Sequence, residues 1–164
     1  MEVCEEMQLL RNYLDVKKIP WHDDSEEFET SKKDFEMWIC RTKFIYKAHK
    51  VSVINGMGTY GGWGGANLSE VNLGLLEIMI DDNEPFGWLN AEECMELLET
   101  EDERYIDEIA LLGYIREFHD LDVLTLVLQD IIQKTGPIKN EKIAEKIKKH
   151  IASLKGEKNG KENE

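Results

Sequence analysis

The residues most able to support chemistry in this sequence lie in one glycine-rich segment, 55–65, directly after the apolar run 51–54. Six of the twelve glycines lie in this segment. Such a cluster costs backbone entropy, so it indicates left-handed backbone, a close approach to a ligand or a tight turn. Backbone N–H groups of a glycine loop can surround an anion, and neighbouring side chains can add donors or stack on a base. The candidate ligand-binding residues are Asn55, Gly56, Gly58, Thr59, Tyr60, Gly61 and Trp63.

Residues 56–61 match the pattern GxGxxG, and Asp81 and Asp82 follow about twenty residues later. This arrangement resembles the sequence motif of a dinucleotide-binding site. A dinucleotide site needs a helix to begin at the last glycine. Residues 62–65 contain three further glycines, each of which costs a helix about 1 kcal/mol relative to alanine. The segment is therefore interpreted as an aromatic-containing loop at the end of a hairpin, and its expected role is structural. The alternative role for the same segment is binding of a small ligand or nucleotide.

Other catalytic and metal-binding patterns are missing from the sequence. Cys40 and His49 could form a thiol–imidazole pair, but the expected hairpin separates them. The three cysteines (Cys4, Cys40 and Cys94) contain no CxxC pair and indicate free thiols in a reducing cytoplasm. The histidines near aspartates, in 22–24 and 119–122, lack the HExxH spacing of a zinc site. We therefore expect a protein that is not an enzyme and has no cofactor and no metal.

Hydrophobic periodicity predicts an α+β protein. Residues 1–99 are expected to form a module with a small antiparallel sheet and flanking helices, 100–155 a three-helix unit, and 156–164 a disordered tail. Within the first module, Pro20 ends a helix over 2–15, and residues 22–29 are expected to be an acidic solvated loop. The other expected elements are a hairpin of 35–46 and 51–54 with a four-residue turn 47–50, a helix or a buried strand over 75–80, an extended segment 86–89, and a helix over 91–99 with Asn90 and Glu93 as a capping box. The helices expected after that cover 101–119, about 121–134 and 140–155.

The net charge of −14 restricts the classes of partner. Residues 1–133 carry 11 Lys/Arg against 29 Asp/Glu, a balance of −18, whereas residues 134–164 carry 9 Lys against 5 Glu, a balance of +4. An acidic surface repels nucleic acid and favours basic partners, although solubility alone also accounts for it. The sequence has acids at its beginning and no long apolar run, so we expect a cytoplasmic protein without membrane contact. The candidate partner contacts are Glu26, Glu27, Glu29, Asp81, Asp82, Glu101, Asp102 and Glu103.

Three stretches of this sequence carry a family resemblance: 38–42 (WICRT), 53–62 (VINGMGTYGG) and 73–77 (LGLLE). Together they resemble small proteins encoded by bacteriophages and prophages of Gram-positive bacteria, over residues 5–98. No catalytic motif accompanies the resemblance. It implies a phage protein that antagonises host defence, as an anti-CRISPR-like inhibitor does. The function expected from charge and resemblance is therefore a non-catalytic acidic protein that masks a basic, nucleic-acid-handling partner in the bacterial host cell.

Overall fold

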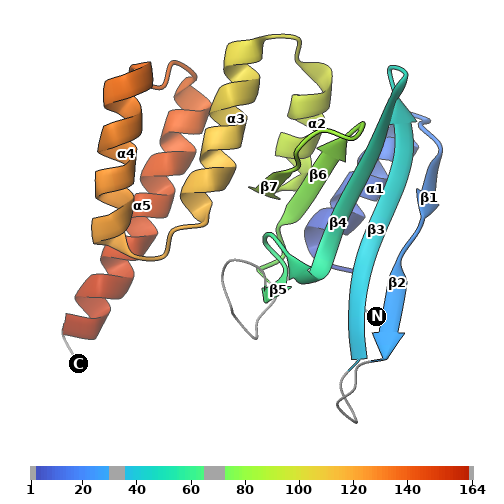
Figure 1. The fold of residues 1–164 in the computed structure, drawn as a ribbon, viewed down its shortest axis with the longest axis horizontal. Helices are drawn as coiled ribbons and strands as arrows, with labels where there is room; N and C mark the ends of the chain where they lie inside the picture. Colours follow the sequence, from blue (N-terminus) through green and yellow to red (C-terminus); the bar gives the residue numbers. More distant parts are fainter. Residues whose placement is uncertain (1–2, 30–35, 65–72, 163–164) are drawn as a thin grey trace. The chain divides into compact units, whose positions relative to one another are not determined.

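The computed structural model describes residues 3–29, 36–64 and 73–162 (Figure 1). The chain divides into two compact units, Met1–Glu99 and Thr100–Glu164. Among the described residues, the first unit contains seven strands and two helices, and the second contains three helices. The predicted α+β fold, with a small antiparallel sheet followed by a three-helix unit, is confirmed.

The sheet of the first unit is built around one long hairpin. Its main path runs β1 (Trp21–Asp23), β3 (Glu36–Tyr46), β4 (His49–Thr59), β6 (Leu76–Ile80) and β7 (Phe86–Leu89), with every neighbouring pair antiparallel. The strand β2 (Glu26–Glu29) pairs antiparallel with the first part of β3, and β1 pairs with its second part. The two-residue strand β5 (Trp63–Gly64) pairs in parallel with the end of β4. The hairpin of β3 and β4 is therefore the centre to which the other strands are added.

The turn of this hairpin is tighter than the sequence predicts. Tyr46 pairs with His49 and Ile45 with Lys50, so only Lys47 and Ala48 form the turn, not residues 47–50. Both turn residues have left-handed backbone, with φ of 48° and 67°. Two consecutive left-handed residues make the turn whose twist matches that of the adjoining strands. The pairing of the two long strands therefore imposes on both turn residues a backbone conformation that residues other than glycine seldom adopt.

The acidic segment 22–29 is not the solvated loop that the sequence predicts. It forms β1 and β2, which cover the outer edge of β3. Unpaired N–H and C=O groups along β3 gain hydrogen bonds from this pairing, and charged side chains on an edge strand discourage further strands from adding. None of residues 21–27 is buried, so the segment needs no apolar alternation to pair with β3, and its sequence shows none.

Two helices, α1 (Glu5–Val16) and α2 (Ala91–Glu99), pack against one face of the sheet (Figure 1). The predicted apolar stripe of α1 is buried, although the helix covers 5–16 in place of 2–15. The 75–80 segment is strand β6, so the strand alternative for it is confirmed and the helix alternative is wrong. The core between helices and sheet contains Met7, Leu10, Leu14, Cys40, Phe44, Val51, Val53, Leu76, Ile78, Leu89, Cys94, Leu97 and Leu98.

A buried arginine joins α1 to two strands. The Nε of Arg11 donates to Oγ1 of Thr42 at 2.9 Å, and its Nη2 lies 3.5 Å from a carboxylate oxygen of Asp23. The guanidinium carbon lies 4.7 Å from the ring centroid of Trp21, the geometry of a cation–π contact. These contacts hold the short strand β1 in place beside β3.

The start of α2 is fixed by the predicted capping box. The backbone N–H of Asn90 donates to Oε1 of Glu93 at 2.9 Å, and the N–H of Glu93 donates to Oδ1 of Asn90 at 2.8 Å. The carboxylate of Glu6, on α1, accepts the N–H of Ala91 at 2.8 Å. Three N–H groups at or next to the helix start therefore have side-chain acceptors, which is why the helix begins where the sequence indicates.

The second unit contains α3 (Glu103–Arg116), α4 (Leu121–Thr135) and α5 (Glu141–Glu162), and both α3 and α4 contact α5. Side chains of Asp102, Asp120 and Asn140 cap the three helices. The buried carboxylate of Glu108 accepts the N–H groups of Lys139 at 2.7 Å and of Asn140 at 3.1 Å, and thereby joins α3 to the beginning of α5.

The helix α5 is longer than the sequence predicts. It continues to Glu162, through a stretch that contains no apolar residue and is expected to be disordered from residue 156. The lysine and glutamate residues of that stretch are good helix formers and allow an existing helix to extend. None of the helices in the described ranges has the length and apolar character that crossing a bilayer requires.

Candidate functional site

The glycine-rich segment is largely strand, not loop. Residues 55–59 complete β4, residues 60–62 turn the chain, and Trp63 and Gly64 form β5. Gly65 lies outside the described residues. After this turn, β5 runs alongside the end of β4 in the same direction and pairs with it at Met57 and Thr59. The predicted loop at a hairpin end is therefore the end of one strand, a short turn and a second, two-residue strand.

Close packing explains two of the glycines. A Cβ at Gly62 would fall on the carbonyl oxygen of Gly56, and one at Gly61 would lie 2.6 Å from Cβ of Leu75. Gly61 also has a φ of 88°, which is left-handed backbone. These positions therefore need glycine because neighbouring backbone occupies the space of a side chain. No ligand is required to account for them.

The hydrogen-bonding groups of the segment are directed to the protein itself. The buried hydroxyl of Thr59 accepts the N–H of Gly56 at 3.0 Å and donates to the carbonyl of Gly56 at 2.9 Å. The N–H of Gly62 donates to the carbonyl of Thr59 at 3.1 Å. The buried amide of Asn55 donates to the carbonyl of Leu75 at 2.8 Å. Since an anion-binding concavity needs N–H groups that point to solvent, this geometry favours the structural interpretation of the segment.

Tyr60 marks the exposed end of the segment. Its ring is partly exposed, and its Cβ would lie 2.7 Å from a Cβ built at Gly87 of β7. Its backbone N–H donates to Oε2 of Glu77 at 3.1 Å. Burial raises the pKa of Glu77, and this hydrogen bond opposes the rise. Gly58 lies in β4 and Trp63 in β5, and a stacking role for Trp63 stays a prediction.

The predicted acidic contacts lie in three separate places. Glu26, Glu27 and Glu29 are on β2, Asp81 and Asp82 are in the turn after β6, and Glu101, Asp102 and Glu103 are at the start of α3 in the other unit. Glu26 pairs with Ile39 of β3, while Asp81 lies beside the Ile45–Lys50 pair. Six residues along a strand correspond to about 20 Å, so the first two groups do not form one surface.

Several of these acids also have partners within the chain. Asp81 accepts the N–H of Lys50 at 3.0 Å and lies 2.8 Å from Nδ1 of His49. These two bonds lower the pKa of Asp81, the one from His49 most. Asp102 caps α3, and a carboxylate oxygen of Glu26 lies 3.6 Å from Nη1 of Arg41. A basic partner at these positions must compete with contacts that stabilise the fold.

The geometry of the cysteines does not favour nucleophilic chemistry. Cys40 pairs with Asn55 in the middle of the hairpin, whereas His49 pairs with Tyr46 beside the turn. Burial raises the pKa of Cys40 and, further, that of Cys94, and the thiolate is the reactive form of cysteine. Across the described residues, no three His, Cys, Asp or Glu side chains come together as a possible metal site.

Charged and exposed apolar side chains come together on a surface other than the glycine-rich segment, namely the face of the sheet opposite α1 and α2. On β3 the side chains of 38, 40, 42 and 44 are buried beneath the helices, so those of 39, 41, 43 and 45 face the other way. We call this face, opposite the helices, the open sheet face. The strand register forms three rows across it: Ile45, Lys50 and Asp81; His22, Lys43, Ser52 and Met79; and Arg41, Ile54 and Glu77.

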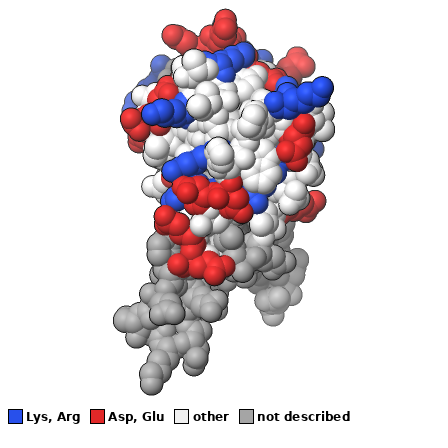
Figure 2. Space-filling model, turned by 90° about the vertical axis from the view of Figure 1, so that its right-hand side faces the viewer, with Lys and Arg blue, Asp and Glu red and all other residues white. Residues whose placement is uncertain are grey.

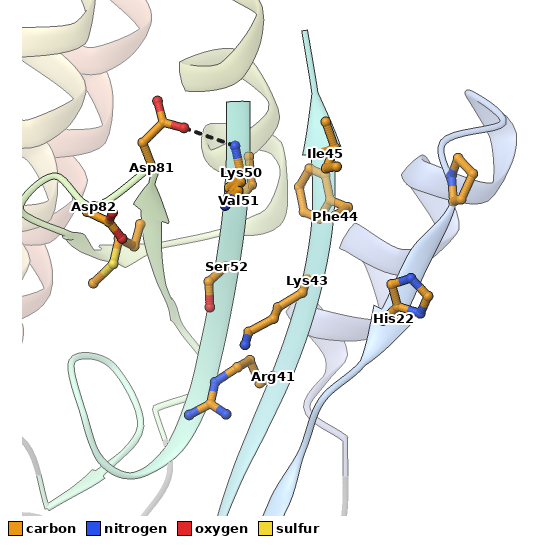
Figure 3. A pocket seen from close by; sticks show the side chains of 12 residues that line it. His22, Arg41, Lys43, Phe44, Ile45, Lys50, Val51, Ser52, Asp81 and Asp82 are labelled. Atoms are coloured by element: carbon orange, nitrogen blue, oxygen red, sulfur yellow. Dashed lines mark hydrogen bonds between the residues drawn. The ribbon is translucent and has the colours of Figure 1, made fainter. Parts of the chain in front are cut away.

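The first two rows and Arg41 surround a cavity of about 830 Å³ (Figure 3). Arg41 and Lys43 of β3 line this cavity together with Ser52 of β4. The side chain of Ile45 is 67 % exposed and that of Met79 is 37 % exposed. Figure 2 shows one side of the molecule on which an area without charged side chains is bordered by groups of both signs. The cavity therefore combines exposed apolar groups with cationic and anionic borders.

The cations of the open sheet face belong to a carboxylate network. Nζ of Lys43 lies 2.8 Å from Oδ2 of Asp24, and Nη1 of Arg41 lies 3.4 Å from the same atom. These two cations lower the pKa of Asp24, Lys43 most. Because all of these side chains are partly exposed, solvent screens the pairs, and a carboxylate from outside can compete for them at modest cost.

Charge is distributed unevenly within the first unit. Residues 36–59, the hairpin, carry four Lys/Arg and one Asp/Glu, whereas the rest of residues 1–99 carries five Lys/Arg and 19 Asp/Glu. The hairpin is therefore the basic part of an acidic unit. Sequence analysis missed this, because only the register of the sheet places Arg41, Lys43 and Lys50 on one surface. The alternation of charged and buried residues at 40–44 was the available signal.

Comparison with known proteins adds no further assignment. No family model matches the chain, and neither a curated protein nor a solved structure shows significant similarity to it. The fold and the open sheet face are therefore the basis for a functional proposal.

Proposed function

We propose that the protein is a non-catalytic binding protein that docks another protein on its open sheet face. The observation that carries the proposal is the exposure of Ile45 and Met79 beside the cations Lys43 and Lys50. Exposed apolar side chains bordered by charged groups are typical of protein interfaces, where the apolar centre supplies affinity and the polar border supplies specificity.

The charge distribution favours a partner segment that carries carboxylates next to an apolar side chain. The acidic remainder of the unit repels such a segment, whereas the basic hairpin attracts it. Within the first unit, repulsion by the surface outside the hairpin orients the partner and disfavours other modes of docking on that unit. The carboxylate of Asp24 already contacts Lys43 and Arg41, so a partner's carboxylate has a position there that is suited to its charge.

The chemistry of the buried thiols does not favour cysteine-based catalysis. The raised pKa values of Cys40 and Cys94 keep these groups protonated at neutral pH. The alternative function, ligand binding by the glycine-rich segment, receives less support because Gly56, Tyr60 and Gly62 use their N–H groups within the fold. The masking of a basic, nucleic-acid-handling partner in host defence stays a prediction. In that prediction the partner binds the acidic surface outside the hairpin, not the open sheet face.

Selection of peptides tests the proposal. A displayed library of random peptides is selected against the immobilised full chain, and recovered peptides are synthesised. We expect peptides that contain Asp or Glu next to apolar residues and that bind more weakly as salt increases. Ile45→Asp should weaken their binding by roughly tenfold or more, as expected for a central contact.

A matched control separates the open sheet face from charge alone. Val16 ends α1, is 81 % exposed, and lies outside the open sheet face. Val16→Asp adds the same charge and should leave the affinity unchanged. The proposal is contradicted if selection recovers no peptide above background, or if the recovered peptides bind Ile45→Asp as tightly as the native chain.

A further inference from the structure

The helix α4 has far more apolar surface than its unit buries. Eight of its fifteen residues are Leu, Ile or Val, but Leu124 is the one apolar residue of the helix that is fully buried. Val123, Leu126 and Ile132 are each exposed by more than a third, and Leu126 by 68 %. An apolar helix in a small unit is normally covered on its apolar side, so the exposed residues of α4 require an explanation.

Two of these exposed residues, Val123 and Leu126, belong to a stripe along one side of the helix, whereas Ile132 lies on the side opposite Val123. Val123, Leu126, Val127, Asp130 and Lys134 are spaced i, i+3, i+4, i+7 and i+11, which places them on one side of an α-helix. The side chains of Asp130 and Lys134 form an ion pair at 3.0 Å at the C-terminal end of this stripe. The buried Leu124 lies about 160° around the helix from Leu126. Leu126, the most exposed residue of the stripe, therefore faces away from the buried side of α4.

We infer that the stripe of α4 docks on α4 of a second copy of this chain, with the two helices antiparallel. The helix has Asp120 and Asp122 at its beginning and Lys134 at its end. In an antiparallel pair the acidic end of each helix meets the basic end of the other, and the two helix dipoles oppose each other favourably. Asp122 and Lys134 are twelve residues apart, about 18 Å along the helix, so Val123, Leu126 and Val127 lie between them, and Asp130 lies beside its partner Lys134 at the basic end.

The pairing is self-complementary and closes on itself. A two-fold axis between antiparallel helices uses the same surface of both copies, so association stops at a dimer. A single helix from each copy presents less than the roughly 800 Å² per partner of a standard interface. The dimer is therefore weak and reversible, and its population depends on protein concentration.

Sedimentation equilibrium of the full chain tests the inference between about 5 µM and 1 mM, the range in which small interfaces associate. We expect the average mass to rise from monomer toward dimer as the concentration rises, and no further. Leu126→Lys should keep the monomer mass throughout this range. The control Val16→Lys changes a side chain of comparable exposure on α1 and should associate as the native chain does.

Charge reversal tests the antiparallel orientation. Asp122→Lys and Lys134→Asp should each weaken association, and the double variant should recover part of it, because the cross-helix pair of residues 122 and 134 is then restored with exchanged signs, although the pair of Asp130 with Lys134 is lost. Circular dichroism checks that each variant retains its helices. Monomer mass of the native chain at all concentrations would overturn the inference, and so would a dimer that Leu126→Lys leaves intact, since another surface would then hold it.

Discussion

Replacement of the Thr59 hydroxyl measures how far the glycine-rich segment is structural. That hydroxyl is buried, accepts the N–H of Gly56 and donates to its carbonyl. Thr59→Val keeps the shape of the side chain and removes both hydrogen bonds. Each lost bond costs about 1 kcal/mol, and a buried group left without a partner costs about 1–3 kcal/mol. We therefore expect Thr59→Val to lower the free energy of unfolding of the first unit by about 2–4 kcal/mol.

The matched control is Thr59→Ser, which keeps the hydroxyl and loses one methyl group. Burial of a methyl group contributes about 0.8 kcal/mol, so this variant should lose roughly 1 kcal/mol. Urea unfolding followed by tryptophan fluorescence reports the first unit selectively, because all four tryptophans lie in residues 1–99. If Thr59→Val unfolds at the same urea concentration as Thr59→Ser, the hydroxyl does not hold the segment, and the structural interpretation fails.

Three further predictions concern titratable groups. The pKa of Glu77 is raised, so its proton binds more tightly in the folded state. The first unit should therefore lose stability as pH rises through that folded pKa, and Glu77→Gln should reduce this loss in urea unfolding at pH 4 to 8. Glu108→Ala leaves the N–H groups of Lys139 and Asn140 without their acceptor and should destabilise the second unit by about 2–4 kcal/mol, measured by helical circular dichroism; Glu108→Gln should lose less. Cys94 should react with a thiol reagent only after unfolding, since it is fully buried with a raised pKa; rapid modification of the native protein at Cys94 would contradict its burial.

Sequence patterns predicted the elements whose causes are local. The stripe of Met7, Leu10 and Leu14 gave α1, and Asn90 with Glu93 gave the start of α2. Both signals operate within a few residues, at helical spacing or at a helix end. The predicted hairpin was confirmed for the same reason, because its two strands are adjacent in the sequence.

Elements that depend on distant partners were not predictable. β1 and β2 form because β3 offers an unpaired edge, and the acidic residues of 22–29 carry no sign of that pairing. The turn at Lys47 and Ala48 lacks the Asn-Gly signal of a tight hairpin. The row of His22, Lys43, Ser52 and Met79 comes from four strands, so only the register of the sheet could reveal it.

The candidate site changed place for the same reason. Residues 55–62 were a candidate ligand site because a cluster of glycines is easily seen in a sequence. The acceptor of the Tyr60 N–H, however, is Glu77, which lies 17 residues further along the chain, so the sequence could not show that this N–H is used within the fold. Conversely, Arg41 and Lys43 were visible in the sequence only as two charges in an apolar strand. The structure places them beside the exposed Ile45 and Met79 at one cavity.

The most direct test of the open sheet face as a docking surface is amide chemical-shift mapping by NMR. A selected acidic peptide is titrated into the isotope-labelled full chain. We predict that the largest shifts fall on residues 41–54 of the hairpin and on Met79, and that Asp24→Asn strengthens binding, because it removes the carboxylate that competes for Lys43 and Arg41. Largest shifts at residues 55–62 or on α4, with the hairpin unchanged, would contradict the proposed function.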